Sequence, residues 1–116
     1  MSDEPSIFTR ILHGELPGEI IAETEHVFAL RDIAPKAPVH LLIIPKTPDY
    51  RDVTELAAAD PALMADMIAL AGRLAHEHAD GEFRLVFNTG ASAGQTVFHV
   101  HAHVLAGELS EKSLGG

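Results

Sequence analysis

The sequence predicts an α+β protein, in which a five-stranded antiparallel sheet carries one short helix at the start and one long helix between strands. Three features lead to this prediction. Short apolar or alternating runs recur between proline and glycine turn signals, which is typical of strands. One longer run repeats its apolar residues at helical spacing. The predicted strands follow one another in hairpin order, which favours antiparallel neighbours.

The first helix and the first hairpin are predicted from capping and turn residues. Ser6 can cap a helix over residues 7–13, and Gly14 can end it. Two runs of strand-forming residues then flank a polar two-residue turn. They predict a hairpin made of residues 19–24 and 27–31.

The middle of the chain predicts a central strand followed by helices. A nearly continuous apolar run over residues 39–44 ends at Pro45, as expected for a buried strand. Asp60 is a capping residue and Pro61 suits a first helical turn, so they mark the start of the long helix, which extends to about residue 79. Two further predicted elements are a short helical piece near residues 53–56 and a strand over residues 82–88.

An alternating stretch over residues 97–105 contains three histidines. Alternation predicts a strand, whose side chains point to opposite faces in turn. His99, His101 and His103 would therefore form a row on one face. The other face would be apolar and covered by the core, and its members are Phe98, Val100, Ala102, Val104 and Ala106.

Such a row allows three interpretations. Two histidines could bind a metal ion with a third ligand from elsewhere. One could be a nucleophile or an acid–base group that its neighbours orient, or the cluster could be fortuitous. The preceding loop, residues 88–96, is rich in uncharged donors and contains neither cysteine nor carboxylate. It therefore suits a phosphate group better than a metal ion, and we expect no metal and no other cofactor.

Composition limits the classes of function. The 116 residues, 47% hydrophobic and 22% charged, predict a single globular domain over residues 1–116. The formal net charge of −9 argues against nucleic-acid binding, which needs basic patches. The chain has no cysteine, no membrane-length apolar run and no signal-peptide pattern, so we expect a cytoplasmic protein that binds no membrane. Residues 1–5 and 108–116 are expected to be mobile ends.

The run His99-Val100-His101-Ala102-His103-Val104-Leu105 resembles the signature of the histidine triad (HIT) family, in which three histidines alternate with apolar residues. Further segments resemble the Hint branch of this family, the nucleoside phosphoramidases: residues 7–11, 14–17, 32–35 and 40–46. The resemblance covers about residues 7–107. It implies a HIT-like fold and a homodimer formed through the long helix and a sheet edge.

The same resemblance implies the reaction. His101 would attack the α-phosphorus of a purine nucleoside 5′-phosphoramidate and form a nucleotidyl-histidine intermediate, which water then hydrolyses. His103 would contact the phosphate or the leaving group, and His99 and His40 would orient His101. The implied substrate-binding residues are Asn88, Gly94, Gln95 and Thr96 at the phosphate, Asp32 at the ribose, and Phe8, Ile11, Leu30 and Ile33 at the base.

Two other functions stay open. A dinucleoside polyphosphate hydrolase of the sister Fhit branch would use the same chemistry, and Gln95 and Thr96 would suit it, although segment 7–17 favours Hint. A nucleotide-binding interaction module with incidental catalysis is the other possibility. Residues 108–116 lack the aromatic residue usual in the Hint branch. The sequence therefore leaves the leaving-group preference open, as it does the choice between adenine and guanine.

Overall fold

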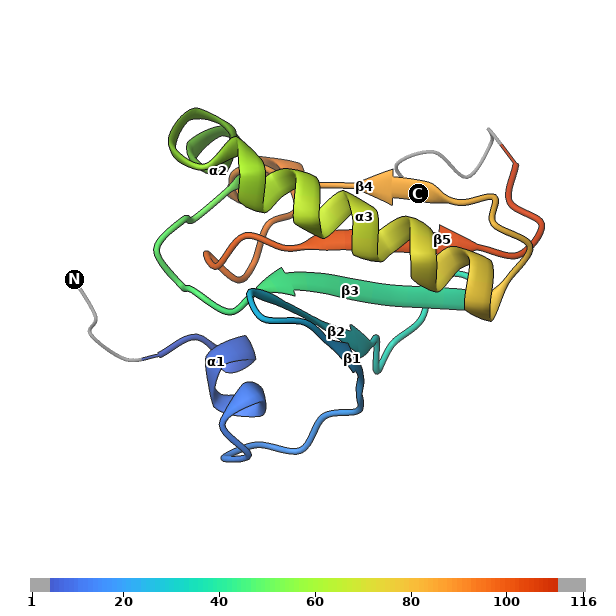
Figure 1. Ribbon diagram of the computed structural model, residues 1–116, viewed down its shortest axis with the longest axis horizontal. Helices are drawn as coiled ribbons and strands as arrows, with labels where there is room; N and C mark the ends of the chain where they lie inside the picture. Colours follow the sequence, from blue (N-terminus) through green and yellow to red (C-terminus); the bar gives the residue numbers. More distant parts are fainter. Residues whose placement is uncertain (1–4, 111–116) are drawn as a thin grey trace.

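A computed structural model describes residues 5–110, which form one five-stranded sheet with helices on both faces (Figure 1). The strand order is β1–β2–β3–β5–β4, and every neighbouring pair is antiparallel. The strands are β1 (Ile20–Glu23), β2 (Val27–Arg31), β3 (Val39–Pro45), β4 (Arg84–Val86) and β5 (Ala102–Ala106). The helices are α1 (Ile7–Leu12), α2 (Val53–Ala59), α3 (Pro61–His78) and the 3-10 turn η1 (Ala91–Ala93). The predicted α+β fold with five antiparallel strands is confirmed.

Both helices that were predicted from capping residues begin where the sequence places them. The Ser6 side chain caps α1, and the chain leaves the helix through Gly14, whose φ of 77° favours glycine. The Asp60 side chain caps α3, and Pro61 occupies its first position. The helix ends at His78, one residue before the predicted end.

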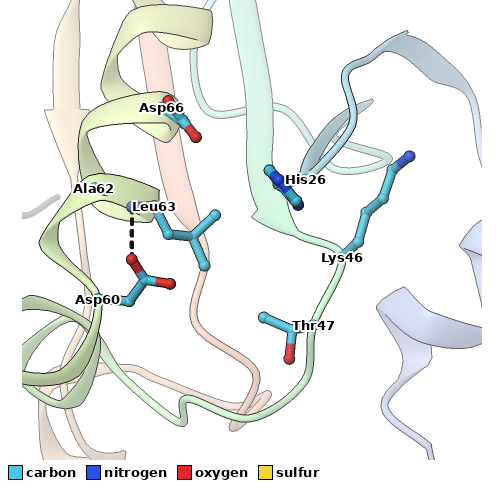
Figure 2. Close-up of a pocket in the computed structure, with 7 residues that line it drawn as sticks. All are labelled: His26, Lys46, Thr47, Asp60, Ala62, Leu63 and Asp66. Carbon is cyan, nitrogen blue, oxygen red and sulfur yellow. Dashed lines mark hydrogen bonds between the residues drawn. The ribbon is translucent and has the colours of Figure 1, made fainter.

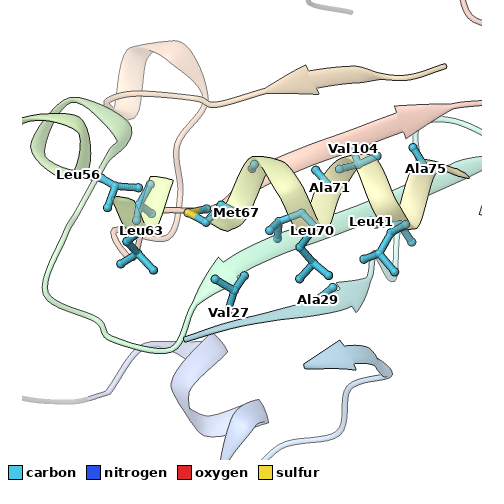
Figure 3. Packing of buried hydrophobic residues seen from close by; sticks show 14 residues of the cluster. Val27, Ala29, Leu41, Leu56, Leu63, Met67, Leu70, Ala71, Ala75 and Val104 are labelled. Atoms are coloured by element: carbon cyan, nitrogen blue, oxygen red, sulfur yellow. The ribbon is translucent and has the colours of Figure 1, made fainter. Parts of the chain in front are cut away.

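The sheet has a hydrophobic core on each face. The larger core lies under α3, where the side chains of β2, β3 and β5 meet the helix (Figure 3). Its members include Val27, Ala29, Leu41, Ile43, Val104, Leu63, Met67, Leu70 and Leu74. On the opposite face Phe28, Leu30 and Ile44 pack with Phe8 of α1. The histidines on β3 and β5 alternate with residues of the larger core, so they lie on the face of α1.

The histidine strand is shorter than predicted. β5 contains only Ala102–Ala106, and the chain bends over residues 97–99 before it. His103 therefore lies on the strand, whereas His99 and His101 precede it. β4 is also shorter than predicted: it contains Arg84–Val86, whereas the sequence predicted a strand over residues 82–88.

The shortening has a physical cause at the end of β3. Pro45 has no N–H group to offer to a ladder, and its carbonyl oxygen lies 2.7 Å from a ring nitrogen of His99. The backbone N–H of Val100 donates instead to the carbonyl of Tyr50 at 2.9 Å. The prediction that the core covers Phe98 is wrong, since its side chain is 50% exposed. The other four apolar residues of that face are buried as predicted.

Within residues 5–110 no helix is both long and apolar enough to cross a membrane. α2 includes the short helical piece that the sequence predicted near residues 53–56. Of the two ends expected to be mobile, residues 1–4 and 111–116 lie outside the described part of the chain.

Candidate active site

Four histidine rings and one phenylalanine ring form a connected series. The ring centroids of Phe8 and His101 are 4.8 Å apart, and those of His101 and His103 are 5.2 Å apart. The His103 ring in turn lies 5.2 Å from that of His40. Phe8 also contacts the His99 ring at 5.9 Å. The structure thus brings together the three histidines of the motif and His40, which β3 supplies from a distant part of the chain.

His99 is buried, and both of its ring nitrogens have partners. Nε2 lies 2.7 Å from the carbonyl oxygen of Pro45, and Nδ1 lies 2.6 Å from Oγ of Ser6. A carbonyl oxygen can only accept a hydrogen bond, so the His99 proton is on Nε2. Nδ1 is then an acceptor, and the Ser6 hydroxyl donates to it.

The same reasoning fixes the proton of His101. Its Nδ1 lies 2.9 Å from the backbone carbonyl oxygen of His99, which again can only accept. Nδ1 therefore carries the proton, and Nε2 carries the lone pair. This is the tautomer that a nucleophilic imidazole needs, with one nitrogen held by the backbone and the other available for attack.

His40 and His103 are linked by a direct hydrogen bond. The backbone N–H of Lys36 donates to Nδ1 of His40 at 3.0 Å, so the His40 proton is on Nε2. The Nε2 atom of His40 lies 2.9 Å from Nδ1 of His103 and 3.4 Å from Oδ2 of Asp32. His103 therefore accepts through Nδ1 and keeps its proton on Nε2. His40 contacts the His103 ring directly, whereas the family resemblance implied that it would orient His101.

Burial keeps all four histidines neutral. Desolvation by burial is the largest cause that lowers the pKa of His40, His99, His101 and His103. The pKa of His103 falls to about 4, because the rings of His101 and His40 add like-charge repulsion. The negative charge of Asp32 partly opposes the lowering at His40, His101 and His103. Near pH 7 each ring therefore donates from one nitrogen and accepts at the other.

A cleft of about 570 Å³ lies beside His103 on this face of the sheet. It reaches from the loop after β2, across β3 and β5, to β4 and the loop that follows it. Its lining residues are Asp32, Ala34, Lys36, His40, Arg84, Val86, Asn88, Ala93, Gly94, His103 and Leu105. The cleft contains the predicted ribose residue and two of the predicted phosphate residues, Asn88 and Gly94.

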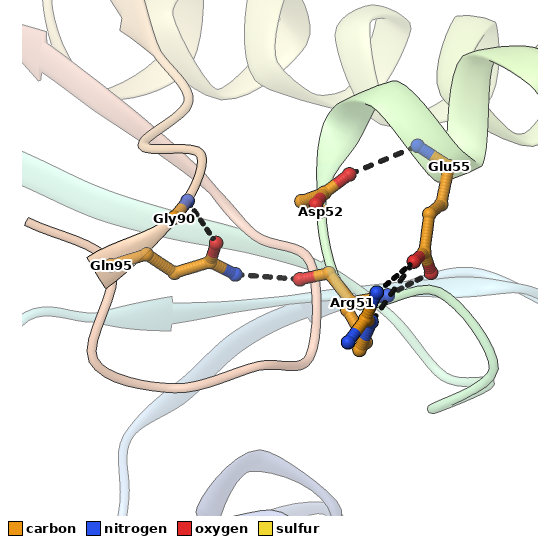
Figure 4. Close-up of polar contacts among 5 residues, drawn as sticks. All are labelled: Arg51, Asp52, Glu55, Gly90 and Gln95. Carbon is orange, nitrogen blue, oxygen red and sulfur yellow. Dashed lines mark hydrogen bonds and ion pairs between the residues drawn. The ribbon is translucent and has the colours of Figure 1, made fainter. Parts of the chain in front are cut away.

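The structure gives Gln95 a different position from the predicted one (Figure 4). Its side chain is 3% exposed, and its Oε1 accepts the N–H of Gly90 at 2.8 Å. Its Nε2 donates to the carbonyl oxygens of Arg51 and Val97, at 2.6 and 3.1 Å. The amide thus holds the loop together, and both of its ends are already engaged.

Gly94 and Thr96, which were also predicted to contact the phosphate, differ in how accessible their donors are. Gly94 adopts a left-handed conformation, with φ of 97°, and its N–H donates to the carbonyl of Ala91 at 3.0 Å. Its backbone donor is thus used within the 3-10 turn in this structure. Thr96 is exposed, so its hydroxyl is accessible to a ligand.

The residues expected at the base are divided between core and surface. Phe8 and Leu30 are 6% and 3% exposed and belong to the smaller core. Ile11 is half-buried against the same core. Ile33 is 96% exposed in the loop after β2. A base stacked here would therefore contact mainly Ile33, Ile11 and the outer edges of the two core residues.

Asp32, His40 and His103 also form the one group of potential metal ligands found within residues 5–110. One ligand atom from each lies within 4.8 Å of the other two. However, the Lys36 N–H donates to Nδ1 of His40, which fixes the His40 proton on Nε2, the atom that faces the cluster. A metal at that nitrogen would require loss of the proton and of the Lys36 hydrogen bond. The donor set therefore fits a hydrogen-bond relay better than a metal ion.

A second hollow of about 300 Å³ lies between the first turns of α3 and the turn after β1 (Figure 2). It holds His26, Lys46, Asp60 and Asp66. The Asp60 carboxylate accepts the N–H of Leu63, because it caps the helix. None of the motif histidines lines this hollow, so it is separate from the candidate active site.

Sequence reasoning did not identify three residues of the site. Ser6 was expected only to cap α1, and nothing local indicates that its hydroxyl reaches His99. Lys36 acts through its backbone N–H, which no side-chain pattern reveals. Arg84 lines the cleft and donates to the carbonyl of Ser110 at 2.8 Å. Alternation with Val86 on β4 is the signal that could have placed Arg84 on this face.

The model of the HIT domain family matches residues 13–109 of the chain. The chain belongs to the HIT family. This HIT protein is 38% identical to purine nucleoside phosphoramidase from Escherichia coli K12. The alignment spans 108 residues and covers 90% of this chain and 88% of the relative. The chain is 36% identical over 110 residues to adenylylsulfatase HINT1 from Arabidopsis thaliana, covering 91% and 74% of the two chains.

The fold comparison agrees with the family. The solved structure of a HIT family hydrolase from Clostridium thermocellum superposes with a TM-score of 0.84 at 40% identity, covering 92% of this chain and 94% of that one. The predicted membership of the HIT family, in its Hint branch, is thus confirmed.

Proposed function

We propose that this HIT protein is a hydrolase that cleaves the P–N bond of purine nucleoside 5′-phosphoramidates, with His101 as the nucleophile. The observation that carries the proposal is the tautomer of His101, whose proton is held on Nδ1 by the His99 carbonyl. The lowered pKa keeps this ring neutral, so Nε2 has a lone pair near pH 7. The similarity to the E. coli purine nucleoside phosphoramidase supports the choice of substrate.

The reaction would proceed in two displacements. Nε2 of His101 forms a bond to the α-phosphorus as the bond from phosphorus to the amine nitrogen breaks, and the electron pair leaves with the amine. His103 has its proton on Nε2, so this N–H can donate a hydrogen bond to a phosphate oxygen or to the departing nitrogen, which takes up a proton from solvent as it leaves. Water then attacks the phosphorus, loses a proton to solvent and breaks the bond to Nε2 of His101, which releases the nucleoside monophosphate and regenerates His101.

Other residues would bind and orient the substrate. Asp32 suits the ribose hydroxyls, since a carboxylate accepts hydrogen bonds. Asn88 lines the cleft and Thr96 is exposed at its loop, so both can donate to phosphate oxygens. Gln95 would contribute indirectly by shaping that loop. No metal or other cofactor is needed for these steps. A cytoplasmic location and a homodimer formed through α3 and the sheet edge stay predictions.

The nucleophile can be tested by replacing its ring. His101→Asn should lower the rate at least about 10⁴-fold, because no covalent route remains. Substrate should still bind, since Asp32 and Asn88 are unchanged. Rapid quenching of the wild type with labelled substrate should trap an acid-labile nucleotidyl-protein adduct. An adduct that forms equally well in His101→Asn, or that maps to His99 or His103, would show that the assigned roles are wrong.

Competing substrates separate the remaining functions. Adenosine phosphoramidate should be hydrolysed in preference to a dinucleoside polyphosphate, and the reverse order would indicate the Fhit type of activity. If nucleotide binds but His101→Asn leaves every cellular phenotype unchanged, the protein would be an interaction module with incidental catalysis.

A further inference from the structure

The N-terminal helix reaches the histidine motif through its capping residue. Ser6 Oγ lies 2.6 Å from Nδ1 of His99, although 93 residues separate the two in sequence. The same Oγ accepts the backbone N–H of Thr9 at 3.1 Å, as an N-cap does. One hydroxyl therefore begins α1 through its lone pair and binds the first histidine of the motif through its proton.

The hydrogen bond from the Ser6 hydroxyl determines which nitrogen of the His99 ring carries the proton. Because Ser6 donates to Nδ1, His99 keeps its own proton on Nε2 and donates it to Pro45 at 2.7 Å. The 1% exposed His99 side chain is thus fixed between α1 and the end of β3. Its backbone carbonyl then receives the Nδ1 proton of His101 at 2.9 Å.

From this chain of contacts we propose that Ser6 is a positioning residue for His101. It acts through His99: the Ser6 hydroxyl fixes the His99 ring, the ring fixes the local backbone, and the His99 carbonyl orients His101. Phe8, two residues further along α1, packs against both rings and supports the same arrangement. The effect on turnover rests on the proposed function, whereas the effect on the His99 tautomer does not.

The two roles of Ser6 can be separated by substitution. Ser6→Thr keeps a capping oxygen and a hydroxyl proton. Ser6→Asp keeps a good capping oxygen but has no proton to donate near neutral pH. Ser6→Ala removes both functions. Asp60→Ala is the matched control, because it removes the side-chain cap of α3 far from the histidines.

Two measurements follow from this design. In the first, ¹⁵N NMR of the imidazole nitrogens at pH 7 should show His99 protonated on Nε2 in the wild type and in Ser6→Thr. Ser6→Ala and Ser6→Asp should change the His99 signals, and those of His101 with them. In the second, kcat should fall about tenfold in Ser6→Ala and Ser6→Asp with little change in KM, since a displaced nucleophile slows the chemical step. Ser6→Thr should restore kcat.

The alternative is that Ser6 only caps the helix. In that case Ser6→Asp would match Ser6→Thr in kcat, and the His99 signals would not change in Ser6→Ala. Asp60→Ala should lower the melting temperature without lowering kcat, and a fall in kcat similar to that of Ser6→Ala would also overturn the proposal. If the wild type hydrolyses no phosphoramidate, the proposed function fails, but the NMR comparison still decides the role of Ser6.

Discussion

At the scale of single residues, the notable property of the site is that its histidines are neutral and that each proton has a definite position. A folded protein with lowered histidine pKa values binds fewer protons in weak acid than its unfolded chain does. The unfolded histidines titrate near 6.5, while His103 titrates at about 4 in the folded protein. Stability is therefore complete above pH 6.5 and is lost as the pH falls from 6.5 toward 4.

The loss of stability in weak acid can be measured. As the pH falls from 7 to 5, the lowered pKa of His103 alone should reduce the free energy of unfolding by about 2 kcal/mol. Urea unfolding at a series of pH values measures the slope. His103→Asn should flatten this slope, whatever the stability of the variant at pH 7. Equal slopes in the wild type and His103→Asn would contradict the assignment.

The hydrogen bond from Lys36 to His40 leads to a second residue-scale prediction. Because it places a proton on the nitrogen that faces Asp32 and His103, the cluster should not need a metal ion. A strong chelator should leave both kcat and the melting temperature unchanged. Activity that is lost on chelation and restored by zinc would show instead that this cluster is a functional metal site.

At the scale of elements, the loop between β4 and β5 depends on one buried amide. Gln95 joins Gly90, Val97 and the segment before α2 through three hydrogen bonds. Gln95→Ala would remove these three part-buried hydrogen bonds and should lower the free energy of unfolding by about 1 to 3 kcal/mol. Chemical denaturation should show this loss, with the exposed Thr89→Ala as control. A loss no larger than that of the control would mean that the loop holds its shape without the amide.

The elements also show which parts of the structure a sequence can predict. Capping is a local signal, and it correctly located the start of α1 at Ser6 and of α3 at Asp60. The start of β5 depends on what lies beside it: Pro45 of β3 cannot continue the ladder, and this is invisible in the alternation of the histidine run. The contacts of Ser6 with His99 and of Gln95 with Arg51 join distant segments, so no local pattern could reveal them.

At the scale of the whole molecule, the strand order determines how a nucleotide would lie. Asp32 follows β2, His40 and His103 lie on β3 and β5, and Arg84 lies on β4, so the cleft crosses four neighbouring elements. α1 adds Phe8 beside His101 on the same face. With the phosphate at the histidines and the ribose at Asp32, the base would lie near α1 and the loop after β2.

The four side chains predicted to contact the base at that place are all apolar. Ile33 is 96% exposed and Ile11 is half-buried, while Phe8 and Leu30 are largely within the core. Such side chains hold a purine by contact area and cannot donate hydrogen bonds to its edge. Adenosine and guanosine phosphoramidates of the same amine should therefore differ by less than about tenfold in kcat/KM, which is about 1.4 kcal/mol. Ile33→Ala should raise KM for both to a similar extent. A thousandfold preference for one base would require a polar contact to the purine edge from another part of the cleft.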